Sequence, residues 1–265
     1  MKPLDTWPLQ ERRGIRGVLT DIDDTLTTDG LLTPEVLLAL DRVRRSGLRL
    51  IAVTGRPTYW AQPLLRLCGF DAVIAENGAS AFWLNPHGVQ QSWFYADAAT
   101  RDAHRRTLLT FAARLCAQFR GVIVADDAPQ RIGDLAFDIG ENRPRLADGV
   151  VEELLAFMRS QGFFAVASSI HAHASLAQFS KQAASTRILQ EVFGIDDATA
   201  RATFAFTGDS GNDASMFAHY PYSVGVANVI GYLPQLTKPP AYIAPGARGA
   251  GFVQVINALL EARES

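Results

Sequence analysis

Three carboxylates follow directly on an apolar run near the start of the chain. Residues Ile15 to Leu19 have the composition of a buried β-strand, and the segment Thr20-Asp21-Ile22-Asp23-Asp24-Thr25 comes immediately after them. Ionised carboxylates are costly to remove from water, so a cluster at the end of a buried strand indicates a cation site or acid–base chemistry. A second acidic cluster, Gly208-Asp209-Ser210-Gly211-Asn212-Asp213, follows another apolar run, Thr203 to Thr207. Two such strand ends suggest one metal site closed by the fold.

Strands and helices alternate over the first 75 residues. After the first strand, Thr33-Pro34-Glu35 begins a helix with a capping residue and a proline, and Gly47 ends it. The uninterrupted apolar run Leu48–Val53 is typical of a strand buried on both faces of a parallel sheet. A helix near Tyr59–Leu67 and a strand at Ala72–Ala75 continue the pattern. The sequence therefore predicts an α/β fold with a doubly wound parallel-sheet core.

The alternation changes in the middle of the chain. Turns and short strands come first, with a hairpin turn at Asn85-Pro86-His87-Gly88, and a long helix follows over about 98–119. Further strands and a helix extend to about residue 175, after which the α/β pattern resumes with a helix at Lys181–Phe193. We expect an inserted α+β cap domain over 85–175 that interrupts a core formed by 1–84 and 176–265.

Composition excludes several classes of protein. The chain has 265 residues, of which 48% are apolar, and its formal net charge is −2. It can fill a globular core, but it lacks the basic charge expected of a nucleic-acid-binding protein. Cys68 and Cys116 stand alone and indicate neither a disulfide framework nor a cysteine metal site. The sequence has no apolar run of membrane-spanning length, so we expect a cytoplasmic monomer or homodimer.

The residues at the strand ends suit phosphoryl transfer. A carboxylate can attack phosphorus, Mg²⁺ can offset the repulsion between the carboxylate and the phosphate, and a second acid can protonate the leaving alkoxide. A hydroxyl and an ammonium group are needed for the remaining phosphoryl oxygens. The candidates for these roles, in that order, are Asp21, Asp209, Asp23, Thr54 and Lys181.

These segments resemble four motifs of the haloacid dehalogenase superfamily. DIDDT at 21–25, VTGR at 53–56, Lys181 and GDSGND at 208–213 occur in the order of motifs one to four. The insert lies between the second and third motifs and resembles a type IIB cap. That subgroup includes sucrose-phosphate and mannosyl-phosphoglycerate phosphatases and phosphomannomutases. The resemblance implies a Mg²⁺-dependent phosphatase acting on a small phosphorylated metabolite such as a sugar phosphate, through an aspartyl-phosphate.

The resemblance also implies roles for single residues. Asp21 would be the nucleophile and Asp23 the general acid and base, while Thr54 and Lys181 would contact the phosphoryl group. The implied metal ligands are the side chains of Asp21 and Asp209 and the backbone carbonyl of Asp23. Asp213 would bind the metal through water or orient the lysine. We also expect substrate contacts from the residues beside these motifs and from the returning end of the cap, which are Gly55, Arg56, Asn212 and His171.

Two alternatives and one departure remain open at this stage. A phosphomutase would return the phosphoryl group to its substrate, and a non-catalytic protein would bind a phosphorylated metabolite without reaction. Asp24 stands where the family usually has glycine, and it either faces away in a turn or strengthens metal binding.

Overall fold

A nine-stranded sheet forms the centre of the molecule. The computed structural model describes residues 1–264, and its large sheet has the strand order β1-β13-β12-β11-β2-β3-β4-β5-β6. The strands from β1 to β4 in this order run parallel, and β5 and β6 are antiparallel additions at one edge. These strands are β1 (Lys2–Pro3), β2 (Gly17–Thr20), β3 (Arg49–Val53), β4 (Ala72–Ala75), β5 (Ser80–Leu84), β6 (Gln90–Phe94), β11 (Phe204–Gly208), β12 (Tyr222–Gly225) and β13 (Tyr242–Ile243). The predicted α/β class with a parallel-sheet core is confirmed.

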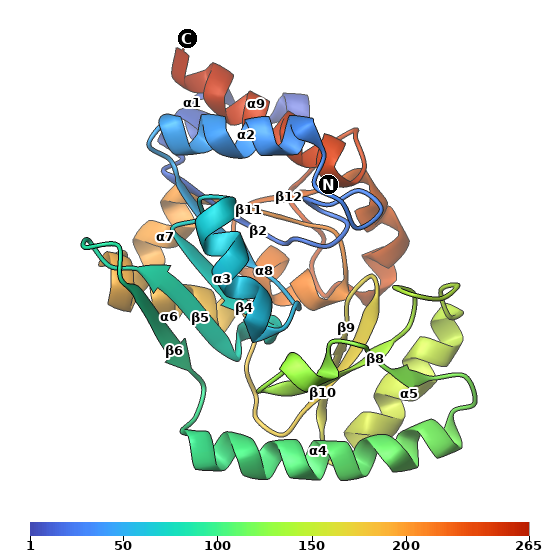
Figure 1. Ribbon diagram of the computed structural model, residues 1–265. Coiled ribbons are helices and arrows are strands. Elements are labelled where there is room, and N and C mark those ends of the chain that lie inside the picture. The colour runs from blue at the N-terminus through green and yellow to red at the C-terminus, as the bar shows by residue number, and fades with distance from the viewer. Residues whose placement is uncertain (265) are drawn as a thin grey trace.

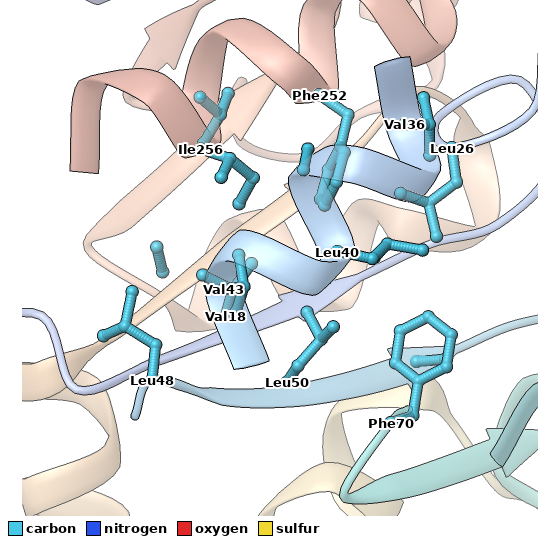
Figure 2. Close-up of a cluster of buried hydrophobic side chains, with 14 of the residues drawn as sticks. Val18, Leu26, Val36, Leu40, Val43, Leu48, Leu50, Phe70, Phe252 and Ile256 are labelled. Carbon is cyan, nitrogen blue, oxygen red and sulfur yellow. The ribbon is translucent and has the colours of Figure 1, made fainter. Parts of the chain in front are cut away.

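Helices cover both faces of this sheet (Figure 1). One face carries α1 (Leu9–Gly14), α2 (Pro34–Arg45), α3 (Thr58–Leu67) and α9 (Arg248–Glu264), and the other carries α6 (Lys181–Phe193), α7 (Asp197–Thr203) and α8 (Ala214–His219). Successive strand residues alternate between the two cores, so that Val18 and Leu50 pack on one side and Leu19 and Ile51 on the other. Figure 2 shows the first core, in which residues of α2 and α9 lie over β2 and β3.

A second, smaller sheet belongs to the insert. Its order is β7-β8-β10-β9, and all of its pairs are antiparallel. The elements of the insert are α4 (Ala98–Gln118), β7 (Ile123–Val124), β8 (Asp134–Asp138), α5 (Asp148–Ser160), β9 (Phe164–Ala167) and β10 (His171–Ser175). Leu135 and Phe137 of β8 pack against α4 and α5, so the alternate residues of that strand face the other way. The face turned away from the helices therefore carries Asp134, and on β10 it carries His171 and His173.

The insert begins later than the sequence boundary at residue 85. Residues 85–94, which the sequence assigns to the cap, form the hairpin turn and β6, and β6 pairs with β5 in the large sheet. A hairpin strand adds to whichever sheet its partner belongs to, and β5 is already paired with β4. The chain thus leaves the core after Phe94. None of the helices among residues 1–264 is both long and apolar enough to span a membrane.

Candidate active site

The two acidic clusters meet at the carboxyl edge of the large sheet. β2 and β11 are parallel neighbours with Thr20 opposite Thr207, and the Asp21 amide donates to the Thr207 carbonyl at 2.9 Å. Asp21 and Asp209 therefore follow adjacent strand ends. One carboxylate oxygen from each of Asp21, Asp209 and Asp213 lies within 4.8 Å of the other two, and all three side chains are buried.

Lys181 joins this cluster from a third segment of the chain. It is the first residue of α6, whose start is fixed by the Ser180 hydroxyl accepting from the Ala183 amide. The ammonium Nζ is 2.8 Å from Asp21 Oδ1 and 2.7 Å from Asp213 Oδ1. The side chain is 1% exposed, so this charge acts on its neighbours with little screening by water.

Burial and mutual repulsion shift the titration of these groups. Burial raises the pKa of Asp21 to about 7, against the attraction of Lys181 and with added repulsion from Asp213 and Asp23. Burial and the charge of Asp21 also raise the pKa of Asp209 well above its usual range. For Lys181, burial alone would lower the pKa, but the carboxylates of Asp21 and Asp213 outweigh it and raise the pKa. With all three carboxylates ionised, the cluster would therefore carry more negative charge than its single lysine balances.

The cluster fits a hard divalent cation such as Mg²⁺. All of its donors are oxygens, which this ion prefers, and its excess negative charge calls for a positive partner. The Asp213 carboxylate is already engaged, because Oδ1 accepts from Lys181 and Oδ2 accepts from the amides of Asp209 and Ser210 at 2.9 and 3.2 Å. Asp21 and Asp209 are thus better placed than Asp213 to offer a direct ligand.

The Asp23 carboxylate is engaged by Arg56. The Arg56 Nε lies 2.9 and 3.0 Å from the two carboxylate oxygens of Asp23, and Nη2 lies 2.7 Å from Oδ1. The third guanidinium nitrogen, Nη1, donates to Glu141 Oε1 of the cap at 2.6 Å. Burial alone would lower the pKa of Arg56, but these two carboxylates raise it.

The ion pairs continue into the cap. Glu141 Oε2 is 2.8 Å from His171 Nε2. The hydrogen bond from His171, against some burial and with the help of Arg56, lowers the pKa of Glu141 to about 2. His171, which the sequence suggests as a substrate contact, is 2% exposed and is engaged with Glu141. The cap is thereby connected to Asp23 through Glu141 and Arg56.

The loop after β3 brings Thr54 and Gly55 to the same edge. The Thr54 hydroxyl oxygen accepts from the Arg56 amide at 3.0 Å, which leaves its proton available to a ligand. Asn212 does not stand alone, because its Nδ2 donates to Asn77 Oδ1 at 2.9 Å. A side chain on Gly55 would lie 3.3 Å from Asn77 Oδ1, so the residues of three loops are in close contact here.

Two buried charges join the cap to the core. Glu76, which follows β4, accepts from the amides of Ile132, Gly133 and Asp134 at 2.7–3.3 Å. Arg131 of the cap donates to the Gly55 carbonyl and to Asp134 Oδ1, both at 2.9 Å. Gly55 follows Thr54, and Glu76 precedes Asn77. The docking of the cap and the geometry of the site are therefore coupled.

Comparison with known proteins finds a similarity to one group of hydrolases. A model of the haloacid dehalogenase-like hydrolases matches residues 18–103, a segment that runs from β2 into α4 and contains Asp21, Asp23 and Thr54. Over this segment the chain is similar to the haloacid dehalogenase-like hydrolases. It is therefore an enzyme. A phosphoglycolate phosphatase of Pyrobaculum neutrophilum is 27% identical over 250 residues, which cover 93% of this hydrolase and 96% of the relative.

Solved structures share the fold of this hydrolase over most of its length. A protein of Thermoplasma acidophilum superposes with a TM-score of 0.68 at 18% identity and covers 93% of this chain and 98% of its own. The sucrose-phosphatase of Synechocystis, solved with sucrose and phosphate, gives 0.62 at 17% identity over 92% and 98%. A subclass IIB sugar phosphatase gives 0.59 at 17% identity over 86% and 93%. The hydrolase therefore has the same fold as these three proteins.

The unusual Asp24 of this hydrolase has a structural explanation. Its φ of 54° lies in the left-handed region, which explains the preference for glycine at this position. Aspartate tolerates that region better than most residues. Its carboxylate Oδ1 lies 3.1 Å from Arg248 Nε of α9, so it forms an ion pair at the rim of the site.

Several residues at the site of the hydrolase have no sequence signal of their own. Asn228 donates to Asp209 Oδ2 at 2.9 Å and to the Asp24 carbonyl at 3.0 Å. Arg131 and Glu141 belong to a polar stretch whose composition is that of a solvated surface. Asn77 lies in an Asn-Gly pair, which indicates first of all a turn. Only the fold brings these side chains together.

Proposed function

We propose that this hydrolase is a Mg²⁺-dependent phosphatase that cleaves a small phosphorylated metabolite, a sugar phosphate or a close derivative. The single observation that carries the proposal is the contact of buried Asp21 with Lys181, beside the carboxylate of Asp209. A nucleophilic carboxylate, a fixed cation and a metal-binding carboxylate are the groups that phosphoryl transfer to aspartate requires. The names of its relatives, a phosphoglycolate phosphatase and sugar phosphatases, support the same chemistry.

The proposed reaction uses these side chains in two steps. A carboxylate oxygen of Asp21 attacks phosphorus, the ester bond to the leaving alkoxide breaks, and an aspartyl-phosphate forms. Lys181 and the Thr54 hydroxyl donate to phosphoryl oxygens as negative charge develops there. After Arg56 has turned away, Asp23 takes up a proton, gives it to the alkoxide and later takes one from the water that releases phosphate. Asp21, Asp209 and the Asp23 carbonyl would hold Mg²⁺, which when bound reduces the repulsion between carboxylate and phosphate.

Arg56 links substrate entry to the release of Asp23. Both carboxylate oxygens of Asp23 are held by Arg56, so Asp23 cannot act on a leaving group until the guanidinium turns away. A phosphate dianion is a strong partner for a guanidinium. We propose that the phosphate group of the incoming substrate replaces Asp23 as the partner of the Arg56 guanidinium. Glu141 and His171 then orient this guanidinium toward the substrate.

Replacement of the nucleophile tests the proposal. Asp21→Asn keeps the shape of the side chain and removes a repelled buried charge, so the fold is retained while turnover of p-nitrophenyl phosphate is lost. The assay is phosphate release with and without Mg²⁺, and Asp102→Asn on the exposed side of α4 is the matched control. Appreciable turnover by Asp21→Asn would contradict the assignment, and sugar isomerisation without release of phosphate would indicate a mutase.

A further inference from the structure

Two buried nitrogen atoms at the boundary of core and cap have no hydrogen-bond partner. They are Asn77 Nδ2, which belongs to the core, and His173 Nε2, which belongs to β10 of the cap. Their side chains are 5% and 3% exposed. Buried polar atoms without a partner are rare and costly, so a pair of them calls for an explanation.

Both atoms face Gly55. A Cβ placed on Gly55 would lie 3.3 Å from His173 Nε2 and 3.4 Å from Asn77 Nδ2. Because glycine has no side chain, residue 55 places only backbone atoms against these two nitrogens, and we call the position bounded by Gly55, Asn77 Nδ2 and His173 Nε2 the niche. Gly55 follows Thr54, and Asn77 is bonded to Asn212, which precedes Asp213. The niche is therefore adjacent to the residues proposed to bind the phosphoryl group.

The hydrogen bonds around Asn77 determine that its unpartnered side-chain atom is a donor. The Ser210 hydroxyl accepts from the Asp213 amide, so its proton goes to Asn212 Oδ1 at 3.1 Å. Asn212 must then turn its Nδ2 toward Asn77, and Oδ1 of Asn77 accepts from it. The remaining atom of the Asn77 amide is its Nδ2, which offers N–H donors to the niche.

The neighbours of His173 fix its free atom as an acceptor. Its Nδ1 is 2.8 Å from Asp134 Oδ2, and Asp134 Oδ1 also accepts from Arg131 at 2.9 Å. Burial would raise the pKa of Asp134, but Arg131 and His173 lower it to about 2, so this residue is an acceptor only. Nδ1 of His173 must then carry the proton. Burial lowers the pKa of His173 despite Asp134, which leaves Nε2 with a lone pair.

One donor and one acceptor on a single niche match a hydroxyl group. We infer that Asn77 and His173 form a subsite that binds a hydroxyl of the substrate close to its phosphate: the hydroxyl accepts from Asn77 Nδ2 and donates to His173 Nε2. A carboxylate or a ketone has no proton to donate and would face the lone pair of His173. This inference rests on the proposed function and narrows its substrates to phosphate esters of alcohols that carry a further hydroxyl.

Pairs of esters that differ by one hydroxyl test this subsite. We would measure kcat/KM for glycerol 3-phosphate against propyl phosphate and for ribose 5-phosphate against 2-deoxyribose 5-phosphate, with phosphoglycolate as the carboxylate probe and p-nitrophenyl phosphate as the hydroxyl-free reference. The native protein is expected to favour the hydroxylated member of at least one pair by about tenfold or more, because loss of the hydroxyl leaves both buried atoms unpaired.

Two variants remove one side of the subsite each. His173→Asn keeps a donor near Asp134 and lacks the outer ring nitrogen, and Asn77→Asp keeps the bond from Asn212 and replaces the donor by an oxygen. Aspartate also tolerates the φ of 54° at this position. In each variant, the ratio of kcat/KM between the two esters of a pair should be close to one. A change that affects all esters alike cancels in this ratio. His87→Asn, in the exposed hairpin turn, is the matched control.

The outcomes separate the two proposals. Turnover of p-nitrophenyl phosphate with an unchanged preference in both variants would overturn the hydroxyl subsite and leave the phosphatase standing. The hydroxyl subsite would also be overturned, and the phosphatase left standing, if the native protein cleaved phosphoglycolate better than every hydroxylated ester. Failure of the native protein to cleave p-nitrophenyl phosphate and all other esters would overturn the proposed function itself.

Discussion

Arg131 allows the sharpest prediction about stability. Its side chain is fully buried and donates to Asp127, Asp134 and the Gly55 carbonyl. The pKa of about 2 for Asp134, against an ordinary 3.8, corresponds to about 2.4 kcal/mol of native stability at neutral pH. Arg131→Met removes the part of this gain that Arg131 supplies, while His173 remains, and leaves buried Asp134 without its strongest partner. We expect a loss of about 3 to 5 kcal/mol at pH 7.

Arg131→Met should also reverse the effect of low pH on the stability of the protein. In the native protein the stability contributed by Asp134 is complete above pH 4 and is lost as the pH falls toward 2, because its folded pKa is low. In Arg131→Met, burial dominates and raises the pKa of Asp134, so stability should increase as the pH falls from 7 toward 4.

Urea unfolding at pH 7 and pH 4.5 measures both effects. Arg106→Met, on the exposed side of α4, controls for loss of an arginine. Adding Asp134→Asn to Arg131→Met should recover part of the loss, since it removes the stranded charge. A loss below about 1 kcal/mol, or an unchanged dependence on pH, would refute the account of a buried ion pair that holds the cap together.

Three further predictions concern the site. Asp23→Asn should reduce kcat about 100-fold or more for alkyl phosphates but far less for p-nitrophenyl phosphate, whose leaving group needs no proton; equal losses for both would argue against a general acid. Saturating Mg²⁺ should stabilise the protein by about 2.7 kcal/mol at 100 times Kd, and Asp209→Asn should abolish this gain in a thermal melt. Gly78→Ala should destabilise the fold, since Gly78 has φ 110° and a Cβ there would lie 2.4 Å from the Ser180 carbonyl; an unchanged melting temperature would show that the turn can relax.

The sequence was sufficient to predict where the carboxylates meet. Asp21 and Asp209 each follow an apolar strand, and the strands of a parallel sheet end at a common edge, so their approach follows from topology alone. Lys181 was predictable for a similar reason, because Ser180 begins a helix at its position. Local patterns suffice when each residue is placed by the element it begins or ends.

The partners of these residues were not predictable. Arg56 pairs with Asp23 and with Glu141, and the choice depends on how the cap docks, which no local pattern encodes. Arg131 belongs to a polar stretch, and only its long-range contact with Gly55 accounts for its burial. The sequence HAHAS at 171–175 has few strong strand formers, yet β10 lies at the middle of the cap sheet because its alanines fit beneath α4 and α5. The strands β1 and β13 have two residues each, too few for any periodicity.

The pairing of β2 with β11 has a consequence for synthesis on the ribosome. β2 emerges early and can pair with β3 on one side, but its other edge must wait for Phe204–Gly208, after the entire insert has been translated. Until then a nascent chain presents an open apolar edge, the kind that recruits other unfolded chains. Growth conditions that slow translation late in the message should therefore lower the yield of native enzyme more than equal delays near its start.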